Sequence, residues 1–112
     1  MSSKSKAVRK KYIKGRAFEY KIRRFFEAMG FYCVRSAGSH TDFDIVAIRN
    51  GQCIGIQCKA SPNKLPDSSL EILAKQLGIT TVFAQKISGN RVRLYFFKPN
   101  GEQSVREAVI KA

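Results

Sequence analysis

Residues 41–60, with the sequence TDFDIVAIRNGQCIGIQCKA, predict a β-hairpin around which the rest of the chain is arranged. The segments 44–48 and 53–58 are rich in residues that favour strands. Asn50-Gly51 lies between them and supplies the two positive-φ positions that a type I′ turn requires. The hairpin therefore has a defined register, in which Arg49 faces Gln52.

Counting back from this turn places four polar residues on one face of the hairpin. Asp44 falls opposite Gln57 and Asp42 opposite Lys59, with Cβ atoms of directly opposed residues roughly 4.5–5.5 Å apart. A three-residue turn with a bulge would shift the pairing by one residue and separate Asp44 from Gln57. The other face is expected to lie in the core and carries Ile45, Ala47, Ile54, Ile56 and Cys58.

The four polar residues allow a structural and a functional interpretation. Taken singly, the aspartates are solvated residues at the start of a strand, and Lys59 is a charge that discourages edge-to-edge aggregation. Taken together, an acid pair that faces a lysine on an apolar hairpin calls for a functional explanation, because no other acid occurs between Asp44 and Asp67 in this basic chain. A metal-dependent site for phosphodiester cleavage supplies one, with carboxylates for the cation and an ammonium group beside the attacked phosphate.

The order Asp44-(x)12-Gln57-x-Lys59, preceded by Glu19 on a predicted helix, resembles the PD-(D/E)xK nuclease superfamily. Within it the chain is similar to the archaeal-type Holliday junction resolvases. Further segments that carry this likeness are Lys14-Gly-Arg-Ala-Phe-Glu19, Gly-Phe at 30–31, Arg35-Ser-Ala-Gly-Ser39 and Asp-Ile-Val-Ala at 44–47. Two positions depart from the motif, since Gln57 replaces its second carboxylate and Phe43 replaces its proline.

The resemblance implies a single α/β domain with a restriction-endonuclease-like fold, in which helices flank a mixed central sheet. It implies a structure-specific endonuclease that cuts four-way DNA junctions as a homodimer, without a small-molecule cofactor. The implied catalytic set is Glu19, Asp44, Gln57 and Lys59. The first three would hold Mg²⁺, with Mn²⁺ as a substitute, and Lys59 would orient or help deprotonate the attacking water. Whether Asp42 belongs to this set is left open by the sequence.

Two other functions remain open on the sequence. One is a nuclease of the same superfamily that acts on DNA ends, flaps or mismatches. The other is a DNA-binding protein without catalysis, in which Gln57 records the loss of the metal site.

The charge of the chain favours a polyanionic partner, nucleic acid first and an anionic membrane surface second. Its 112 residues suit one domain, and 21 Lys and Arg against 8 Asp and Glu give a formal net charge of +13. No apolar run is long enough to span a bilayer, and the start lacks the apolar core of a signal peptide. We therefore expect a protein of the cytoplasm, associated with the nucleoid or, for a virus, with the host cytoplasm. Cys33, Cys53 and Cys58 are expected to be small buried residues and not disulfides.

The start of the chain predicts a basic, partly disordered arm over residues 1–14, followed by the nuclease domain at 15–112. A helix begins near Gly15 and ends at Gly30, with an apolar stripe of Phe18, Ile22, Phe25, Phe26 and Met29. On spacing alone Glu19 would pair with Arg23 of the next turn. The residues predicted to contact DNA are Lys10, Lys11, Lys14, Arg16, Arg35, Ser36 and Ser39; His40 receives no catalytic role.

The remaining elements follow from turn and periodicity patterns. Residues 31–35 predict a strand and 68–77 a helix, and 80–87 and 91–97 predict two strands of a hairpin. Residues 94–97 are apolar on both faces, which predicts a helix on one face and a partner subunit on the other. Residues 102–112 predict a final amphipathic helix.

Overall fold

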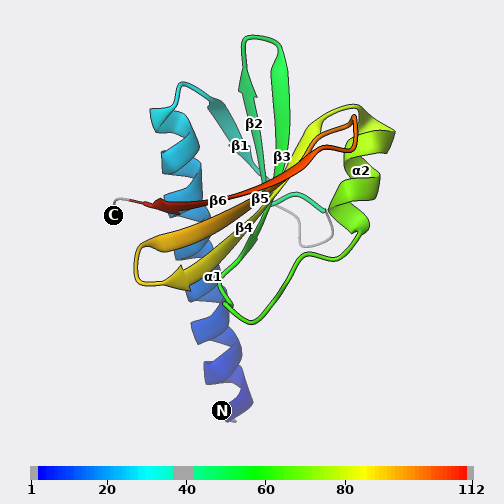
Figure 1. The fold of residues 1–112 in the computed structure, drawn as a ribbon. Coiled ribbons are helices and arrows are strands. Elements are labelled where there is room, and N and C mark those ends of the chain that lie inside the picture. Colours follow the sequence, from blue (N-terminus) through cyan, green and yellow to red (C-terminus); the bar gives the residue numbers. More distant parts are fainter. Residues whose placement is uncertain (1–2, 37–41, 111–112) are drawn as a thin grey trace.

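The computed structural model describes residues 3–36 and 42–110, with side chains described from residue 15 onward. Along the chain the elements are α1 (Ser3–Ala28), β1 (Tyr32–Arg35), β2 (Ile45–Arg49), β3 (Gln52–Lys59), α2 (Ser69–Leu77), β4 (Thr80–Ser88), β5 (Arg91–Phe97) and β6 (Gln103–Val109) (Figure 1). Helix α1 begins at Ser3, so it starts well before the predicted Gly15 and runs past the edge of the sheet (Figure 1). The division into an arm and a domain stays a prediction.

The six strands form one mixed sheet in the order β1-β2-β3-β4-β5-β6. Neighbouring strands are antiparallel except β3 and β4, which are parallel. Parallel neighbours need a crossover connection, and α2 provides it. The predicted fold class, a mixed sheet flanked by helices, is confirmed.

The hairpin of β2 and β3 has the predicted turn. Asn50 and Gly51 have φ values of 50° and 78°, and Arg49 faces Gln52. The register then continues as predicted to the pair Ile45 and Ile56. The predicted core face is buried at Ile45, Ala47, Ile54 and Ile56, and Cys58 packs against it while partly exposed.

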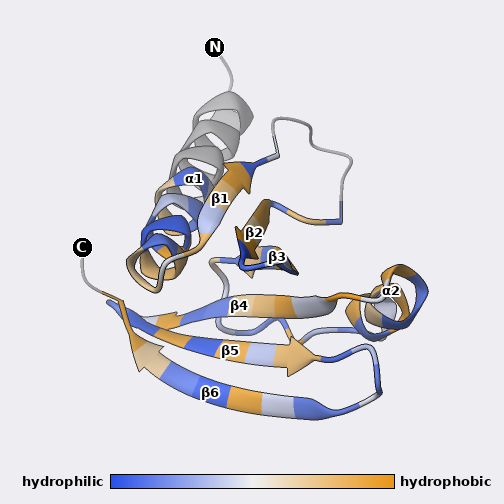
Figure 2. Cartoon of the chain, turned by 90° about the horizontal axis from the view of Figure 1, so that it is seen from above, coloured by the Kyte–Doolittle hydropathy of each residue, from blue (hydrophilic) through white to orange (hydrophobic). Residues whose placement is uncertain are grey.

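Two apolar clusters lie on opposite faces of the sheet. Phe18, Ile22 and Phe26 of α1 pack against β1, β2 and β3, and the cluster extends to Ala84 of β4. The preceding residue of β4, Phe83, belongs instead to the cluster under α2, because side chains alternate along a strand. Figure 2 shows α1 beside β1 and α2 at the far end of β4.

Strand β5 is apolar on both faces because each face packs against an apolar cluster of this same chain. Leu94 and Phe96 pack with the α1 cluster, whereas Tyr95 and Phe97 pack with the α2 cluster. The helix predicted on one face is present. The second face is filled from the same chain, so this strand does not require the predicted partner subunit.

The predicted final helix over residues 102–112 is wrong, because residues 103–109 form strand β6. β6 pairs along the whole of β5, from Arg91 with Val109 to Phe97 with Gln103. The turn before it contains Asn100-Gly101, with Gly101 at φ 93°. This turn and the unpaired edge of β5 outweigh the helical spacing of the apolar residues. Residues 111–112 lie outside the described part.

Candidate active site

Asp44 lies where the chain enters β2, and its backbone is held on both sides. Its N–H donates to the carbonyl oxygen of Ile56 at 2.8 Å, and its carbonyl oxygen accepts from the N–H of Ser36 at 2.9 Å. Ile56 is already the partner of Ile45. Two residues of one strand thus face one residue of the other, which is a β-bulge. The predicted opposition of Asp44 and Gln57 is therefore wrong.

The bulge changes what the Asp44 carboxylate meets. Its Oδ2 accepts a hydrogen bond from the backbone N–H of Cys58 at 2.7 Å. The carboxylate also lies near Glu19 of α1, whose pKa it raises. The alternation that predicted one shared face for Asp44 and Gln57 is broken here, and Asp44 instead joins a residue of the helix.

Glu19 forms the second carboxylate of the site. Its side chain is 19% exposed, and its Oε2 accepts a hydrogen bond from Nε of Arg35 at 3.3 Å. Burial raises the pKa of Glu19, the charge of Asp44 raises it further, and Arg35 opposes both effects. The spacing-based pair of Glu19 with Arg23 is wrong, since Arg23 approaches Glu27 at 3.7 Å.

A pocket of about 310 Å³ next to Glu19 collects three guanidinium groups. It is lined by Arg16, Ala17, Glu19, Tyr20, Arg23, Arg35 and Ile45. Two residues predicted to contact DNA, Arg16 and Arg35, are thus brought to the same pocket as a predicted catalytic carboxylate. Tyr20 had no predicted role, although Arg23 and Arg24 follow it at the helical spacings of three and four. Their guanidinium carbons lie 5.2 and 5.7 Å from the centre of its ring.

The other predicted contacts with DNA are distributed differently. Ser36 serves the site through its backbone N–H, which binds the carbonyl oxygen of Asp44. Ser39 and His40 lie outside the described residues. Lys10, Lys11 and Lys14 belong to the part of α1 whose side chains are not described. Their predicted roles stay predictions.

Gln57 and Lys59 flank Cys58 on β3, next to the N–H that binds Asp44. Gln57 is half-buried and Lys59 is exposed. Over residues 15–36 and 42–110, neither side chain makes a hydrogen bond or ion pair with Glu19 or Asp44. Asp42 is exposed near the start of β2. The structure brings Glu19, Asp44 and Arg35 together. The roles predicted for Gln57 and Lys59 stay predictions.

The donor set of the site fits a hard divalent cation in part. Two carboxylates lie close enough for one to raise the pKa of the other, and a cation between them would remove that repulsion. In the described part of the chain, no group of three or more His, Cys, Asp and Glu residues is placed to hold a metal. Further oxygen ligands would have to come from Gln57, the substrate or water.

The three cysteines are free and half-buried. Burial raises the pKa of the Cys58 thiol well above its ordinary value, and the charges of Asp44 and Glu19 add to that effect. The thiol therefore stays protonated at neutral pH. Cys58 contributes to the site through its backbone N–H, which sequence patterns do not reveal.

Comparisons with known proteins identify the family of this chain. The family described as archaeal Holliday junction resolvase (hjc) matches residues 10–108. The chain belongs to the archaeal Holliday junction resolvase family. The crossover junction endodeoxyribonuclease Hjc of Methanocaldococcus jannaschii is 31% identical over an alignment of 113 positions, which covers 94% of this chain and 84% of that protein. The family predicted from the sequence is confirmed.

A solved structure supports the fold of this family member. The Holliday junction resolvase Hjc of Archaeoglobus fulgidus matches with a TM-score of 0.55 and 22% identity, covering 86% of this chain and 84% of that one. The mixed sheet and its two helices thus correspond to a known resolvase fold.

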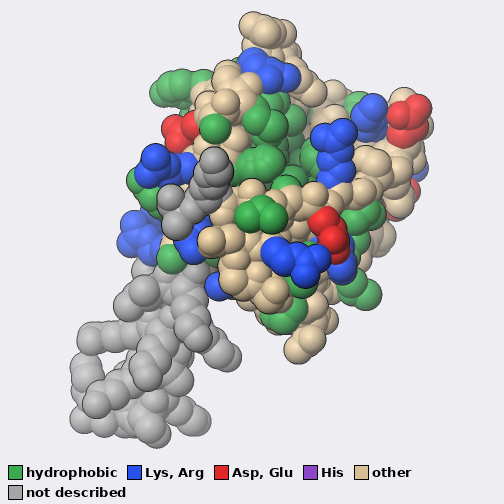
Figure 3. All heavy atoms as spheres, turned by 60° about the vertical axis from the view of Figure 1, so that its left-hand side comes forward, with side chains coloured by type: hydrophobic (Ala, Val, Ile, Leu, Met, Phe, Trp, Pro, Cys, Tyr) green, Lys and Arg blue, Asp and Glu red, His purple; other side chains and the backbone are tan. Residues whose placement is uncertain are grey.

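Lys and Arg outnumber Asp and Glu in this chain by 21 to 8. On the side where α1 lies, Lys and Arg side chains are spread over the face and acidic side chains occur in few places (Figure 3). Among the described residues, no helix is both long and apolar enough to cross a membrane.

Proposed function

We propose that this protein cleaves four-way DNA junctions by hydrolysing phosphodiester bonds with the help of Mg²⁺. The observation that carries the proposal is the pair of Glu19 and Asp44, drawn from α1 and the start of β2 and flanked by Arg35. The resolvase names of its relatives support junction DNA as the substrate. Such an enzyme would act in the cytoplasm, on DNA of the nucleoid.

Each residue of the site has a distinct task in this proposal. Glu19, Asp44 and the amide oxygen of Gln57 would hold Mg²⁺ or its substitute Mn²⁺. The ion would supply charge stabilisation at the phosphate and make water a better nucleophile. The N–H of Cys58 fixes the orientation of the Asp44 carboxylate. Lys59 would orient the water or help remove its proton.

Arg35 would bind Glu19 at all times and a DNA phosphate as well when DNA is bound. It binds Glu19 at 3.3 Å and lines the same pocket as Arg16. A guanidinium group has five donors, so Arg35 can keep Glu19 in place while it also receives a phosphate. Arg16, which lines the same pocket, would bind the same phosphate.

We further propose that the active form is a homodimer. Resolution of a four-way junction requires two cuts in strands related by symmetry, and two copies related by a two-fold axis present two sites in matching orientation. The fold supports this because both edge strands, β1 and β6, carry exposed apolar side chains.

Because Gln57 replaces a motif carboxylate, one alternative function remains, that of a protein that binds junctions and does not cut them. The experiment that decides is incubation with a four-way junction, a linear duplex and a single strand, each with Mg²⁺ or with EDTA. We expect nicks near the branch point of the junction only, and only with Mg²⁺. Asp44→Asn, which keeps the shape but removes one charge, should bind the junction without cutting it. Binding without cutting by the wild type identifies this alternative, and cutting of duplex ends identifies another nuclease of the superfamily.

A further inference from the structure

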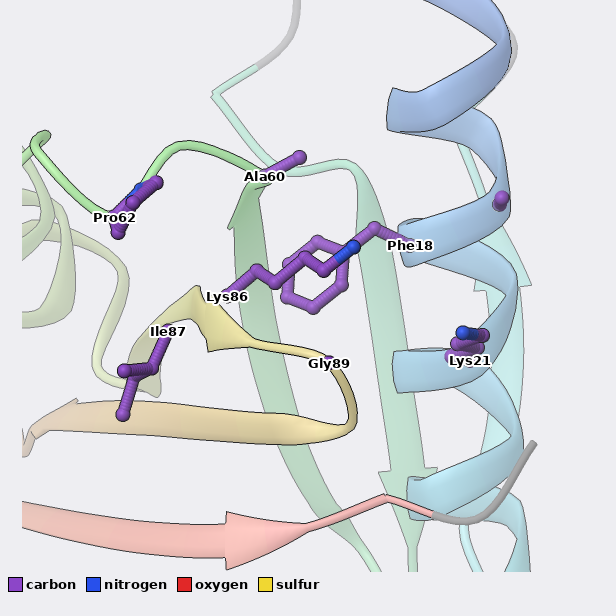
Figure 4. A pocket seen from close by; sticks show the side chains of 8 residues that line it. Phe18, Lys21, Ala60, Pro62, Lys86, Ile87 and Gly89 are labelled. Carbon is purple, nitrogen blue, oxygen red and sulfur yellow. The ribbon is translucent and has the colours of Figure 1, made fainter.

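A second pocket lies on another flank of α1 from the pocket with the three arginines. It has a volume of about 270 Å³ and lies between α1, the loop after β3 and the end of β4 (Figure 4). Its lining residues are Ala17, Phe18, Lys21, Ala60, Pro62, Lys86, Ile87 and Gly89. The apolar residues form walls, and the only charged side chains among the eight are the two lysines.

Lys21 and Lys86 reach this pocket from elements far apart in the sequence. The side chain of Lys86 extends from β4 toward α1, and Lys21 lies on α1 across from it (Figure 4). Both are half-buried. Among the ion pairs of the described residues, neither lysine has a partner. Two half-buried lysines around a pocket whose lining contains no carboxylate make a site for an anion.

The pocket adjoins the proposed active site through two pairs of consecutive residues. Phe18 lines the pocket, and Glu19 beside it belongs to the carboxylate pair. Ala60 lines the pocket, and Lys59 beside it is the proposed catalytic lysine. β3 and β4 are parallel and Lys59 faces Gln85, so Ala60 and Lys86 follow at the same end of the two strands. An anion bound here therefore lies at the carboxyl end of β3, next to the proposed catalytic lysine.

We propose that Lys21 and Lys86 hold a DNA backbone phosphate next to the one that is cut. This inference rests on the proposed function, because it takes DNA as the polyanion. A lysine is a flexible point charge that binds phosphate without reading a base, so the contact is independent of sequence. It would fix the path of the cut strand between α1 and the β4–β5 turn.

The proposal is tested by junction binding in EDTA, where no cutting interferes. Lys21→Gln/Lys86→Gln removes two charges and keeps much of the length of each side chain. The matched control is Lys75→Gln/Lys98→Gln, which removes the same two charges from lysines paired with Glu71 and Glu102 elsewhere on the molecule. Fluorescence anisotropy across a salt series gives both the Kd and its salt dependence.

We expect the Lys21/Lys86 variant to bind at least about tenfold more weakly than the control. The slope of log Kd against log salt should fall by about 0.9 for each phosphate that the variant no longer binds. If the Lys21/Lys86 variant binds like the control, the pocket proposal is wrong. The nuclease function is then still supported if the wild type cuts the junction with Mg²⁺. If the wild type binds but does not cut, the nuclease function fails while the same lysine comparison still decides the pocket.

A second measurement places the phosphate independently of affinity. The wild type is treated with an amine-reactive ester, with and without junction DNA, and the modified lysines are identified by mass spectrometry. We expect DNA to protect Lys21 and Lys86 several-fold and to leave Lys75 and Lys98 unchanged. Equal modification of Lys21 and Lys86 with and without DNA overturns the assignment.

Discussion

The ring of Phe43 lies directly against the backbone of Gly55. A Cβ added to Gly55 would come within 2.6 Å of two ring atoms of Phe43, closer than van der Waals contact allows. Phe43 also packs with the apolar cluster under α2. Because Phe43 immediately precedes Asp44, this contact fixes where the chain enters β2. The small size of Gly55 thus positions a carboxylate that it does not touch.

We expect Gly55→Ala to displace the Phe43 ring and to lower stability by about 1–3 kcal/mol, the usual cost of overpacking. Cleavage should fall more than binding, because Asp44 moves with Phe43. Thermal unfolding and single-turnover cleavage measure the two effects. Gly15→Ala is the control, since nothing lies within 4 Å of a Cβ at that helix position, and it should stabilise the protein slightly. Unchanged cleavage and stability for Gly55→Ala would show that the Phe43 ring can shift without moving Asp44.

The raised pKa of Glu19 predicts how stability changes with pH in the metal-free protein. A carboxyl group with a folded-state pKa above its ordinary 4.5 binds protons more tightly when folded. Its contribution to the free energy of unfolding falls as pH rises from 4.5 through the folded pKa, and it stays low above that. Glu19→Gln should therefore be more stable than the wild type at neutral pH in EDTA, and this gain should vanish below the ordinary pKa of 4.5.

Glu107 provides a control of opposite sign for this measurement. A hydrogen bond from Arg93 holds its pKa below the ordinary value. Glu107→Gln should therefore lose stability at neutral pH and lose nothing at acidic pH. Melting temperatures of both variants from acidic to neutral pH suffice. If Glu19→Gln is less stable at every pH, the bond with Arg35 outweighs burial and repulsion by Asp44.

Lys59→Ala should reduce cleavage by about 100-fold or more and leave junction binding nearly intact. The first effect follows from the loss of a group that acts on the water, and the second because many other Lys and Arg residues contact phosphates. Cleavage rates and anisotropy on the same junction make the comparison, with Lys98→Ala as the control. A parallel loss of binding would assign Lys59 to the fold or to an interface.

The hairpin could be predicted from sequence because its information is local. Asn50-Gly51 fixes the turn, and the register follows residue by residue as far as Ile45. The predicted register fails at Asp44, where the strand has a bulge. We attribute the bulge to the packing of Phe43 in the cluster under α2, and the other residues of that cluster come later in the chain. Local patterns contain no trace of such a contact.

The ion pair of Glu19 with Arg35 was missed for the same kind of reason. Helical spacing offered Arg23, whereas the actual partner stands sixteen residues away on β1. The predicted final helix is wrong because residues 103–109 suit either structure, and the Asn100-Gly101 turn together with the free edge of β5 selects a strand. The family resemblance supplied what spacing did not, namely the prediction that Glu19 belongs to the site, and the structure places Glu19 near Asp44.

We expect a dimer in solution, formed through an edge of the sheet. Exposed apolar side chains mark both edge strands, with Tyr32 at 73% and Val34 at 48% on β1, and Val105 at 57% and Val109 at 72% on β6. Unpaired edges with such side chains are surfaces that proteins normally cover. Light scattering at micromolar concentration should give the mass of two chains.

Charged substitutions then identify the edge. Tyr32→Lys/Val34→Lys and Val105→Lys/Val109→Lys form a matched pair, and one of them should give a monomer while the other stays dimeric. A monomeric wild type, with and without junction DNA, would remove the paired-cut mechanism and leave an enzyme that makes single cuts.

Gln57 stands where the family motif has its second carboxylate, and it predicts that cleavage needs an unusually high metal concentration. An amide in place of a carboxylate removes one negative charge from the proposed ligand set, while its oxygen can still donate a lone pair. Glu19, Asp44 and the substrate phosphate keep enough charge for the ion, so we expect tight metal binding only when DNA is present.

Replacing Gln57 in two directions tests this proposed role. Gln57→Glu restores the charge and should lower the Mg²⁺ concentration for half-maximal cleavage, whereas Gln57→Ala removes the ligand oxygen and should raise it sharply. Gln52→Ala, at the exposed start of the same strand, is the control and should titrate like the wild type. The bulge at Asp44 makes the test sharper, because Gln57 is not held opposite Asp44 by the register and must reach the ion with its own side chain. If Gln57→Ala titrates like Gln52→Ala, Gln57 is no ligand, and the ion rests on Glu19, Asp44 and the phosphate alone.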